Sequence, residues 1–165
     1  MRLLIIICLS FYIKGAIAQE QKQYISSSKE LVGTWQYNTP QLGDAYGKNF
    51  QFYKNGTFVL NYSQYNDIGR IAKITGKYEA KDSSIYLTLV SRTEVEGGKL
   101  VAGSYGFQKE EFVLNGGKPV TIKQTGEKPE PFVLTKCKSK NGAKCIQINN
   151  NKYYQISVDP NKDPQ

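Results

Sequence analysis

The side chains that most enzymes use for proton transfer and metal binding are sparse in this chain. It contains no histidine, which excludes Ser-His-Asp and Cys-His nucleophile systems, imidazole bases and histidine metal sites. Glu94 and Glu96 lie on one side of an expected strand, about 7 Å apart, a separation that inverting glycosidases use. They precede Gly97-Gly98, which predicts a turn, and no apolar surroundings raise a carboxyl pKa there. We therefore interpret them as solvated acids at a hairpin tip and expect neither enzyme activity nor a cofactor.

A second group of oxygen ligands lies at the C-terminus. Asp159, Asn161 and Asp163 alternate as ligands do at the start of a calcium loop. The turn glycine and the closing glutamate of such a loop are missing, and Pro160 interrupts it. We expect no metal site, and we expect 159–165 to be a frayed C-terminal tail.

Cysteine spacing predicts a disulfide. Cys137 and Cys145 flank the turn Lys140-Asn141-Gly142, and they are the only cysteines outside the N-terminal segment. A three-residue hairpin loop would place them directly opposite each other, at a Cα separation of about 4.5–5.5 Å that suits a disulfide. A redox site is the weaker alternative, because the neighbouring lysines would activate a thiolate only modestly.

The same tripeptide pattern fixes the register of an earlier hairpin. A three-residue loop at Lys54-Asn55-Gly56 pairs Phe52 with Phe58 and Phe50 with Leu60. All four side chains then share one buried face, whereas a two-residue Asn-Gly turn would divide them between both faces. We expect the glycine that ends each tripeptide to adopt positive φ.

The N-terminal segment resembles a secretory signal peptide over 1–18. Arg2 precedes an eleven-residue apolar run, Leu3 to Ile13, and Ala16-Ile17-Ala18 is a small-x-small cleavage signal with the cut expected after Ala18. The run is shorter than the roughly 20 residues of a transmembrane helix, so we expect a secreted or periplasmic protein without a transmembrane segment. The remaining boundaries predicted are a lead-in at 19–28, one domain at 29–158 and the tail at 159–165.

Charge and chain length favour a single basic domain. Removing 1–18 leaves 147 residues with 20 basic and 14 acidic side chains, a net charge of +6. The charge is mostly single lysines between apolar residues, and only Arg70 and Arg92 remain to make bidentate contacts. We interpret this as a solvated basic surface and expect no nucleic-acid binding.

Short alternating runs separated by Gly, Asn, Asp and Pro predict an antiparallel all-β domain. A single helical turn is expected at 27–31, where Ser27 and Glu30 have capping-box spacing. The expected strands are 32–38, 48–53, 57–63, 70–79, 84–92, 99–106, 107–114, 119–123, 131–137, 144–149 and 152–158.

Several of these stretches resemble the lipocalins, and in particular the small secreted lipocalin-like domains of bacteria. The similar segments are Leu31-Val32-Gly33-Thr34-Trp35, the hairpin 50–58, Gly76-Lys77-Tyr78-Glu79 and the strand 85–89. The resemblance implies an antiparallel up-and-down barrel of about eight to ten strands. It also implies that Gly33 and Trp35 close one end of that barrel.

One family feature is altered. Lipocalins stack an arginine from the last strands on this tryptophan, but Arg70 and Arg92 lie mid-chain. The late strands offer only Lys136, Lys144 and Lys152 instead.

What the resemblance implies for function is the binding of a small, partly apolar molecule inside the barrel, without catalysis. Tyr78 and Tyr105 would supply hydroxyl groups, although strand propensity alone also explains a tyrosine-rich chain. Gly76 would leave room for a ligand atom or would only relieve strand curvature. The candidate interior residues are Phe50, Phe52, Phe58, Leu60, Ile74, Tyr78, Leu87 and Tyr105.

An alternative function needs no cavity. A barrel with a filled interior could bind a protein or a glycan through its loops or its outer face. The two functions differ in whether the inward side chains meet in the middle of the barrel or leave a void.

Overall fold

The computed structural model describes residues 24–41, 47–63, 69–102, 112–125, 128–138 and 142–162. The expected signal peptide 1–18, its cut after Ala18 and the candidate residue Tyr105 lie outside the described residues. Within the described ranges, no helix has the length and apolar character needed to cross a membrane.

Most of the described chain is extended, as the alternating pattern predicts. A single 3-10 turn, η1 (Ser28–Leu31), begins after Ser27, whose Oγ accepts a hydrogen bond from Lys29 N at 3.3 Å. The strands are β1 (Gly33–Tyr37), β2 (Asn49–Phe52), β3 (Thr57–Asn61), β4 (Ile71–Lys81), β5 (Ser84–Glu96), β6 (Lys99–Ala102), β7 (Phe112–Asn115), β8 (Lys118–Lys123), β9 (Glu130–Cys137), β10 (Cys145–Ile148) and β11 (Asn151–Ser157).

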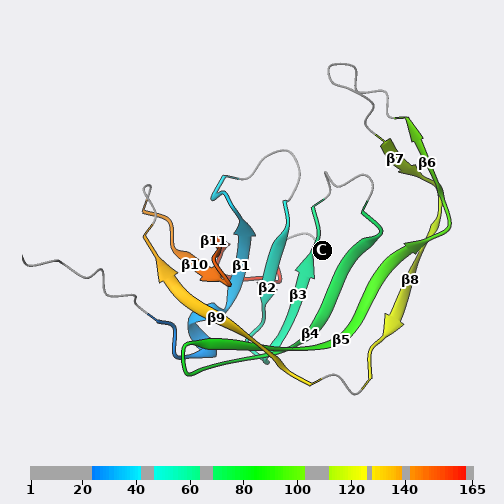
Figure 1. Cartoon of the computed structure of the whole chain (residues 1–165). Coiled ribbons are helices and arrows are strands. Elements are labelled where there is room, and N and C mark those ends of the chain that lie inside the picture. The colour runs from blue at the N-terminus through cyan, green and yellow to red at the C-terminus, as the bar shows by residue number, and fades with distance from the viewer. Residues whose placement is uncertain are drawn as a thin grey trace, which may run out of the picture.

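Eight of these strands form a closed antiparallel barrel (Figure 1). Hydrogen-bonded neighbours follow the order β4-β3-β2-β1-β11-β10-β9-β5, and β4 pairs with β5 to close the ring. Neighbours are consecutive in the chain except where β1 meets β11 and where β5 meets β9. The predicted fold class, an all-β up-and-down barrel preceded by a short helical turn, is confirmed.

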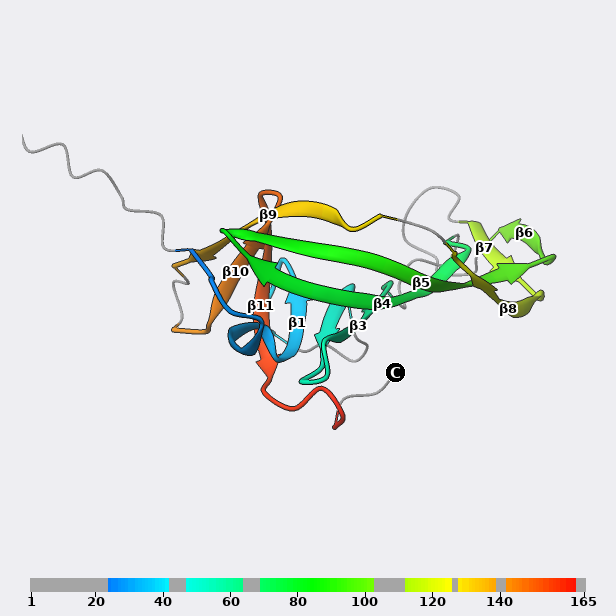
Figure 2. The ribbon, with the colours of Figure 1, turned by 90° about the horizontal axis from the view of Figure 1, so that it is seen from below.

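The long strand β5 leaves the barrel wall partway along its length. Ser84 to Leu87 pair with β9, whereas Ser91 to Glu96 pair with β8. Farther out, β6 pairs with β7 in a separate two-stranded sheet. Strands β5 to β8 therefore form a ribbon that projects from one side of the barrel, as Figures 1 and 2 show from two directions.

Four glycines form a joint in this ribbon. Gly97 and Gly98 link β5 to β6, Gly116 and Gly117 link β7 to β8, and their φ angles lie between 71° and 95°. The turn predicted at Gly97-Gly98 is wrong, because the ribbon continues past the glycines and the chain reverses only after β6. Consequently the acidic pair before the joint is not at a hairpin tip.

The registers predicted for both hairpins are confirmed. Phe52 pairs with Phe58, and Gly56 has a φ of 79°. Cys137 pairs with Cys145, the two residues form a disulfide, and their Cα atoms are 5.1 Å apart. The loop between the cysteines includes 139–141, which lie outside the described residues, but Gly142 has the expected positive φ of 72°.

Part of the barrel's outer face is covered by the end of the chain. Gln51 on β2 is fully buried, and its Nε2 donates to Pro160 O at 3.5 Å. Gln51 Oε1 also accepts from Asn61 Nδ2 at 3.3 Å and from Tyr53 Oη at 3.2 Å. The start of the expected C-terminal tail therefore lies against β2 at Pro160, where it supplies a polar partner to the buried Gln51.

Candidate binding site at the open end of the barrel

The end of the barrel next to η1 is capped. Trp35 is 2% exposed, and its Nε1 donates to Leu31 O at 2.6 Å. Gly33 has a φ of 133°, and a Cβ there would lie 2.8 Å from Gln155 Nε2, so only glycine allows this approach of β1 to β11. Gly33 and Trp35 therefore both lie beside η1 at this end of the barrel.

A lysine ion pair spans the same end. Lys136 Nζ lies 2.8 Å from Glu30 Oε2, which joins β9 to η1. The cation–ring contact found in the described residues is elsewhere, between Lys48 Nζ and the Tyr62 ring at 5.3 Å. Glu30, Lys136 and Trp35 line one pocket at this end of the barrel.

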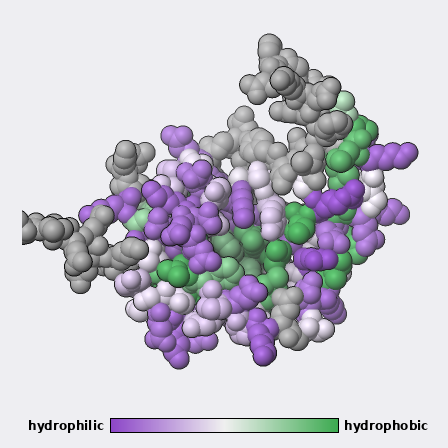
Figure 3. Space-filling model, in the orientation of Figure 1, coloured by the Kyte–Doolittle hydropathy of each residue, from purple (hydrophilic) through white to green (hydrophobic). Residues whose placement is uncertain are grey.

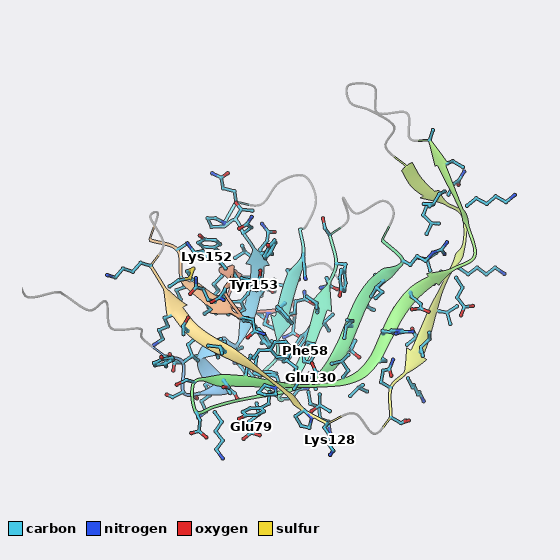
Figure 4. The ribbon with its side chains drawn as sticks, in the orientation of Figure 1. Phe58, Glu79, Lys128, Glu130, Lys152 and Tyr153 are labelled. Atoms are coloured by element: carbon cyan, nitrogen blue, oxygen red, sulfur yellow. A yellow bond between two sulfur atoms is a disulfide. The ribbon has the colours of Figure 1, made fainter. Side chains whose placement is uncertain are left out.

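Aromatic rings fill the barrel interior behind the cap. The Phe50 and Phe52 centroids are 5.2 Å apart, Phe52 is 4.8 Å from Tyr78, and Phe50 is 5.3 Å from Tyr153. Figure 4 labels Phe58 and Tyr153 inside the ring of strands. Rings at these distances touch, so no ligand fits between them. The candidate interior residues that are at most 7% exposed are Phe50, Phe52, Phe58, Tyr78 and Leu87.

Tyr78 points its hydroxyl group toward the capped end. Its Oη donates to Tyr53 O at 3.0 Å, and burial raises the pKa of this phenol. The space beside Gly76 is also occupied, because a Cβ there would lie 2.6 Å from Phe58 Cε1. The hydroxyl group predicted to orient a ligand is therefore already bonded to the backbone, and Gly76 makes room for a ring of the protein itself.

Away from η1, the barrel strands carry apolar side chains that are only half buried. One row of directly paired residues crosses the sheet from β2 to β8, and such pairs share a face. The row consists of Phe50, Leu60, Ile74, Arg92 and Ile122. Phe50 is buried and the other four are half buried. Phe132 on β9 is half buried as well, and it packs against the same core.

We call Leu60, Ile74, Arg92, Ile122 and Phe132 the mouth. Figure 3 shows apolar surface over the centre of the barrel strands, bordered by hydrophilic side chains. At the mouth, Arg92 Nε lies 3.1 Å from Glu94 Oε2, with the two side chains 40% and 24% exposed. The interpretation of Glu94 as a solvated acid is therefore wrong, because Arg92 lies two residues away on the same side of β5 and pairs with it.

Sequence reasoning places only Leu60 and Ile74 of the mouth among the candidate site residues. Phe132 has an inward position by simple alternation, so the pattern could have found it. Arg92 has no such signal, because the register shifts between Thr75 and Gly76 of β4. The bulge turns Arg92 inward, whereas uninterrupted alternation from Leu87 would turn it outward.

Three pockets in the described part of the chain lie around the capped end. One, of about 360 Å³, lies beside η1 and the disulfide and is lined by Trp35, Glu30 and Lys136. Another of about 360 Å³ is lined by Val32 and Tyr78, and one of about 530 Å³ lies between the β2–β3 turn and the C-terminal segment. None of the three is lined by a phenylalanine of the interior.

The described residues hold no cluster that suggests metal chemistry. No group of three or more cysteine, aspartate or glutamate side chains is placed there to hold a metal ion. Asp159 Oδ1 accepts hydrogen bonds from Asn161 N at 3.1 Å and Asn161 Nδ2 at 3.0 Å, and these bonds lower the pKa of Asp159.

Comparison of the chain with models of protein families, with curated proteins and with solved structures finds no match.

Proposed function

We propose that this chain is a binding protein without catalytic activity, which holds a small, partly apolar molecule at the mouth of its barrel. The observation that carries the proposal is the half-buried apolar row at the open end, next to an interior that aromatic rings already fill. When a ligand covers half-exposed apolar side chains, their surface is removed from water, which favours binding. The lipocalin-like Gly-x-Trp segment supports the same class of protein by analogy of fold.

The mouth offers both the apolar contacts and the polar group that such a ligand needs. Leu60, Ile74 and Ile122 supply apolar contact, and Phe132 on β9 is a further half-buried ring that packs against the core. Arg92 carries more donors than one carboxylate oxygen can use, so a polar group of the ligand can bond to the guanidinium group. A few polar groups within an apolar lining are typical of small-molecule sites.

An added indole at the mouth tests this function. In Ile74→Trp the new ring lies at the mouth, and its emission should shift when a fatty acid, an isoprenoid or an aromatic metabolite binds. Tyr86→Trp is the matched control, because Tyr86 lies on the outer side of β5 and pairs with Glu79. Its emission should not respond to the same ligands. The wild-type protein, with Trp35 buried behind the cap, supplies the background.

Native mass spectrometry of freshly purified protein provides an independent reading. A co-purifying small molecule that Ile74→Glu loses would support the mouth as its site. No bound mass, together with no response of Ile74→Trp to any ligand tested, would reject small-molecule binding.

The second candidate function is a filled barrel that binds a protein or a glycan through its loops or outer face. The specific observation in its favour is the direct ring contact of Phe50 with Phe52 and with Tyr153, which leaves no space for a ligand between these rings. The protein or glycan partner would then bind to the loops or to the outer face of the barrel.

The site of action that we infer is outside the cytoplasm. The disulfide between Cys137 and Cys145 is of the kind that persists in oxidising compartments, and the first 18 residues have the composition of a signal peptide. Export of the full chain should yield a mature protein that begins at Gln19. A mass corresponding to the uncleaved chain in the exported fraction would contradict this.

A further inference from the structure

The outer side of the strands that form the mouth carries a basic, hydroxyl-rich surface. Three rows of paired residues cross it on β3, β4 and β5, and two of the rows extend to β8. We call this set the basic face. Its rows are Thr57, Lys77 and Thr88; Val59, Thr75, Ser91 and Lys123; and Asn61, Lys73, Thr93 and Thr121.

Three lysines surround a pair of hydroxyl groups on this face. Thr75 lies two residues from Lys73 and from Lys77 on β4, and Lys123 lies two strands away in the same row. Strand spacing and rise place the three lysine backbones about 12–13 Å apart. Between them Thr75 Oγ1 and Ser91 Oγ are 2.8 Å apart. The lysine side chains are long enough to converge above these hydroxyl groups.

The lysines of the basic face form no ion pair among the described residues. Its three rows contain no carboxylate, and none of the ion pairs in the described part of the chain involves Lys73, Lys77 or Lys123. Glu79 is in the adjacent row of β4, and Figure 4 shows it projecting from the outside of the barrel. A ligand for this face must therefore bring negative charge.

We propose that the basic face binds an acidic polysaccharide, such as a polymer of uronic acids. Carboxylates repeated along a polymer can pair with several lysines at once, which compensates for the weakness of each exposed ion pair. Sugar hydroxyl groups match the threonine and serine hydroxyls between the lysines. This inference specifies the outer-face alternative above and does not depend on a ligand at the mouth.

Other polyanions fit the basic face less well. Nucleic-acid surfaces rely on arginine and on aromatic rings that stack with bases, and the three rows contain neither. A membrane-binding surface needs large apolar side chains that enter the lipid. The only apolar residue of the rows, Val59, is half buried.

Binding of polygalacturonate to the full chain, measured by isothermal titration calorimetry at several salt concentrations, tests the inference. The variant Lys73→Gln/Lys77→Gln/Lys123→Gln should lose about tenfold or more in affinity at low salt. Its affinity should also depend less steeply on salt, because fewer counterions are released when fewer lysines meet a polyanion. Glu79→Gln should bind more tightly than wild type, a direction that loss of structure would not produce.

A matched triple variant controls for net charge. Lys29, Lys99 and Lys152 are exposed and belong to η1, to β6 and to β11. Their combined change to glutamine removes the same charge and should alter affinity by less than about twofold. An equal loss in both triple variants would reject the basic face as the site.

Two further measurements can overturn the proposal. Absence of wild-type binding to polygalacturonate, or equal binding to neutral dextran, would reject an acidic polysaccharide as the ligand. Tighter binding to phosphatidylglycerol vesicles than to the polymer would assign the face to a membrane. The emission of Ile74→Trp is read without polymer, so the mouth and the basic face can fail separately.

Discussion

Gly56 isolates the free-energy cost of a left-handed backbone. Its φ is 79°, and a Cβ there would meet nothing closer than Tyr78 O at 3.8 Å. We predict that Gly56→Ala destabilises the protein by about 1 kcal/mol, because only the conformational penalty applies. Urea unfolding followed by the emission of Trp35 measures the change. Stabilisation by this substitution would contradict the hairpin register.

Gly76 is restricted for a different reason. Its backbone is ordinary strand, but a Cβ would collide with Thr88 O and lie 2.6 Å from Phe58 Cε1. We predict a loss of about 3 kcal/mol for Gly76→Ala, at the upper end of the usual range for overpacking. The same urea experiment compares the two variants. Equal losses would mean that the Phe58 ring does not depend on this glycine.

At the scale of an element, the disulfide should stabilise the β9–β10 hairpin without being required for folding. Cys137 and Cys145 are eight residues apart, a loop whose closure in the unfolded chain is worth about 2–3 kcal/mol. Reduction should lower the urea midpoint while the folded baseline persists, because a chain of this size buries a sufficient core. The double variant Cys137→Ser/Cys145→Ser should not respond to reductant.

The two-stranded sheet of β6 and β7 should be dispensable for the barrel. The ring of eight strands does not include β6 or β7, and a Cβ on Gly98 would lie 2.8 Å from Gly116 O. We predict that deleting 99–115 and joining Gly98 to Gly116 changes the free energy of unfolding by less than about 1 kcal/mol, as for surface changes away from the core. A loss of cooperative unfolding, seen in the emission of Trp35, would show that the ribbon supports the ring.

At the scale of the whole molecule, the filled interior should make the fold sensitive to alkaline pH. Burial, assisted by the nearby Tyr37 and Tyr62, raises the pKa of Tyr153 from 10.0 to about 12. A raised pKa in the folded state favours the neutral phenol. The contribution to stability is therefore complete below pH about 10 and is lost as the pH rises to about 12.

Tyr153→Phe tests this dependence, because it keeps the ring that contacts Phe50 and removes the ionisable group. The free energy of unfolding of the variant should fall less steeply than that of wild type between pH 10 and 12. Identical pH dependence in both proteins would show that Tyr153 is not responsible for the alkaline loss.

The amino-acid sequence by itself determined the features that depend on interactions between residues close together in the chain. The capping turn at Ser27, the paired phenylalanines around Gly56 and the bridge between Cys137 and Cys145 follow from turn chemistry and alternation within about ten residues. For the two hairpins, the side-chain period and the loop length leave one register that buries the apolar side chains. Repeating that pattern along the chain predicts an antiparallel all-β domain, whereas the barrel was expected only from the resemblance to the lipocalins.

Only the tertiary structure decided which distant residues share a surface. Alternation along the sequence does not reveal the bulge that turns Arg92 inward. It also does not reveal that β5 pairs first with β9 and then with β8. The lysines of the basic face are spread over 73–123, so in the sequence they look like isolated charges. The pairing of β4, β5 and β8 brings them onto one surface. Tyr78, which was expected to orient a ligand, donates instead to the backbone of Tyr53 for the same reason. These outcomes depend on contacts between strands that are far apart in the chain, and the free energy of packing the whole barrel selects among them.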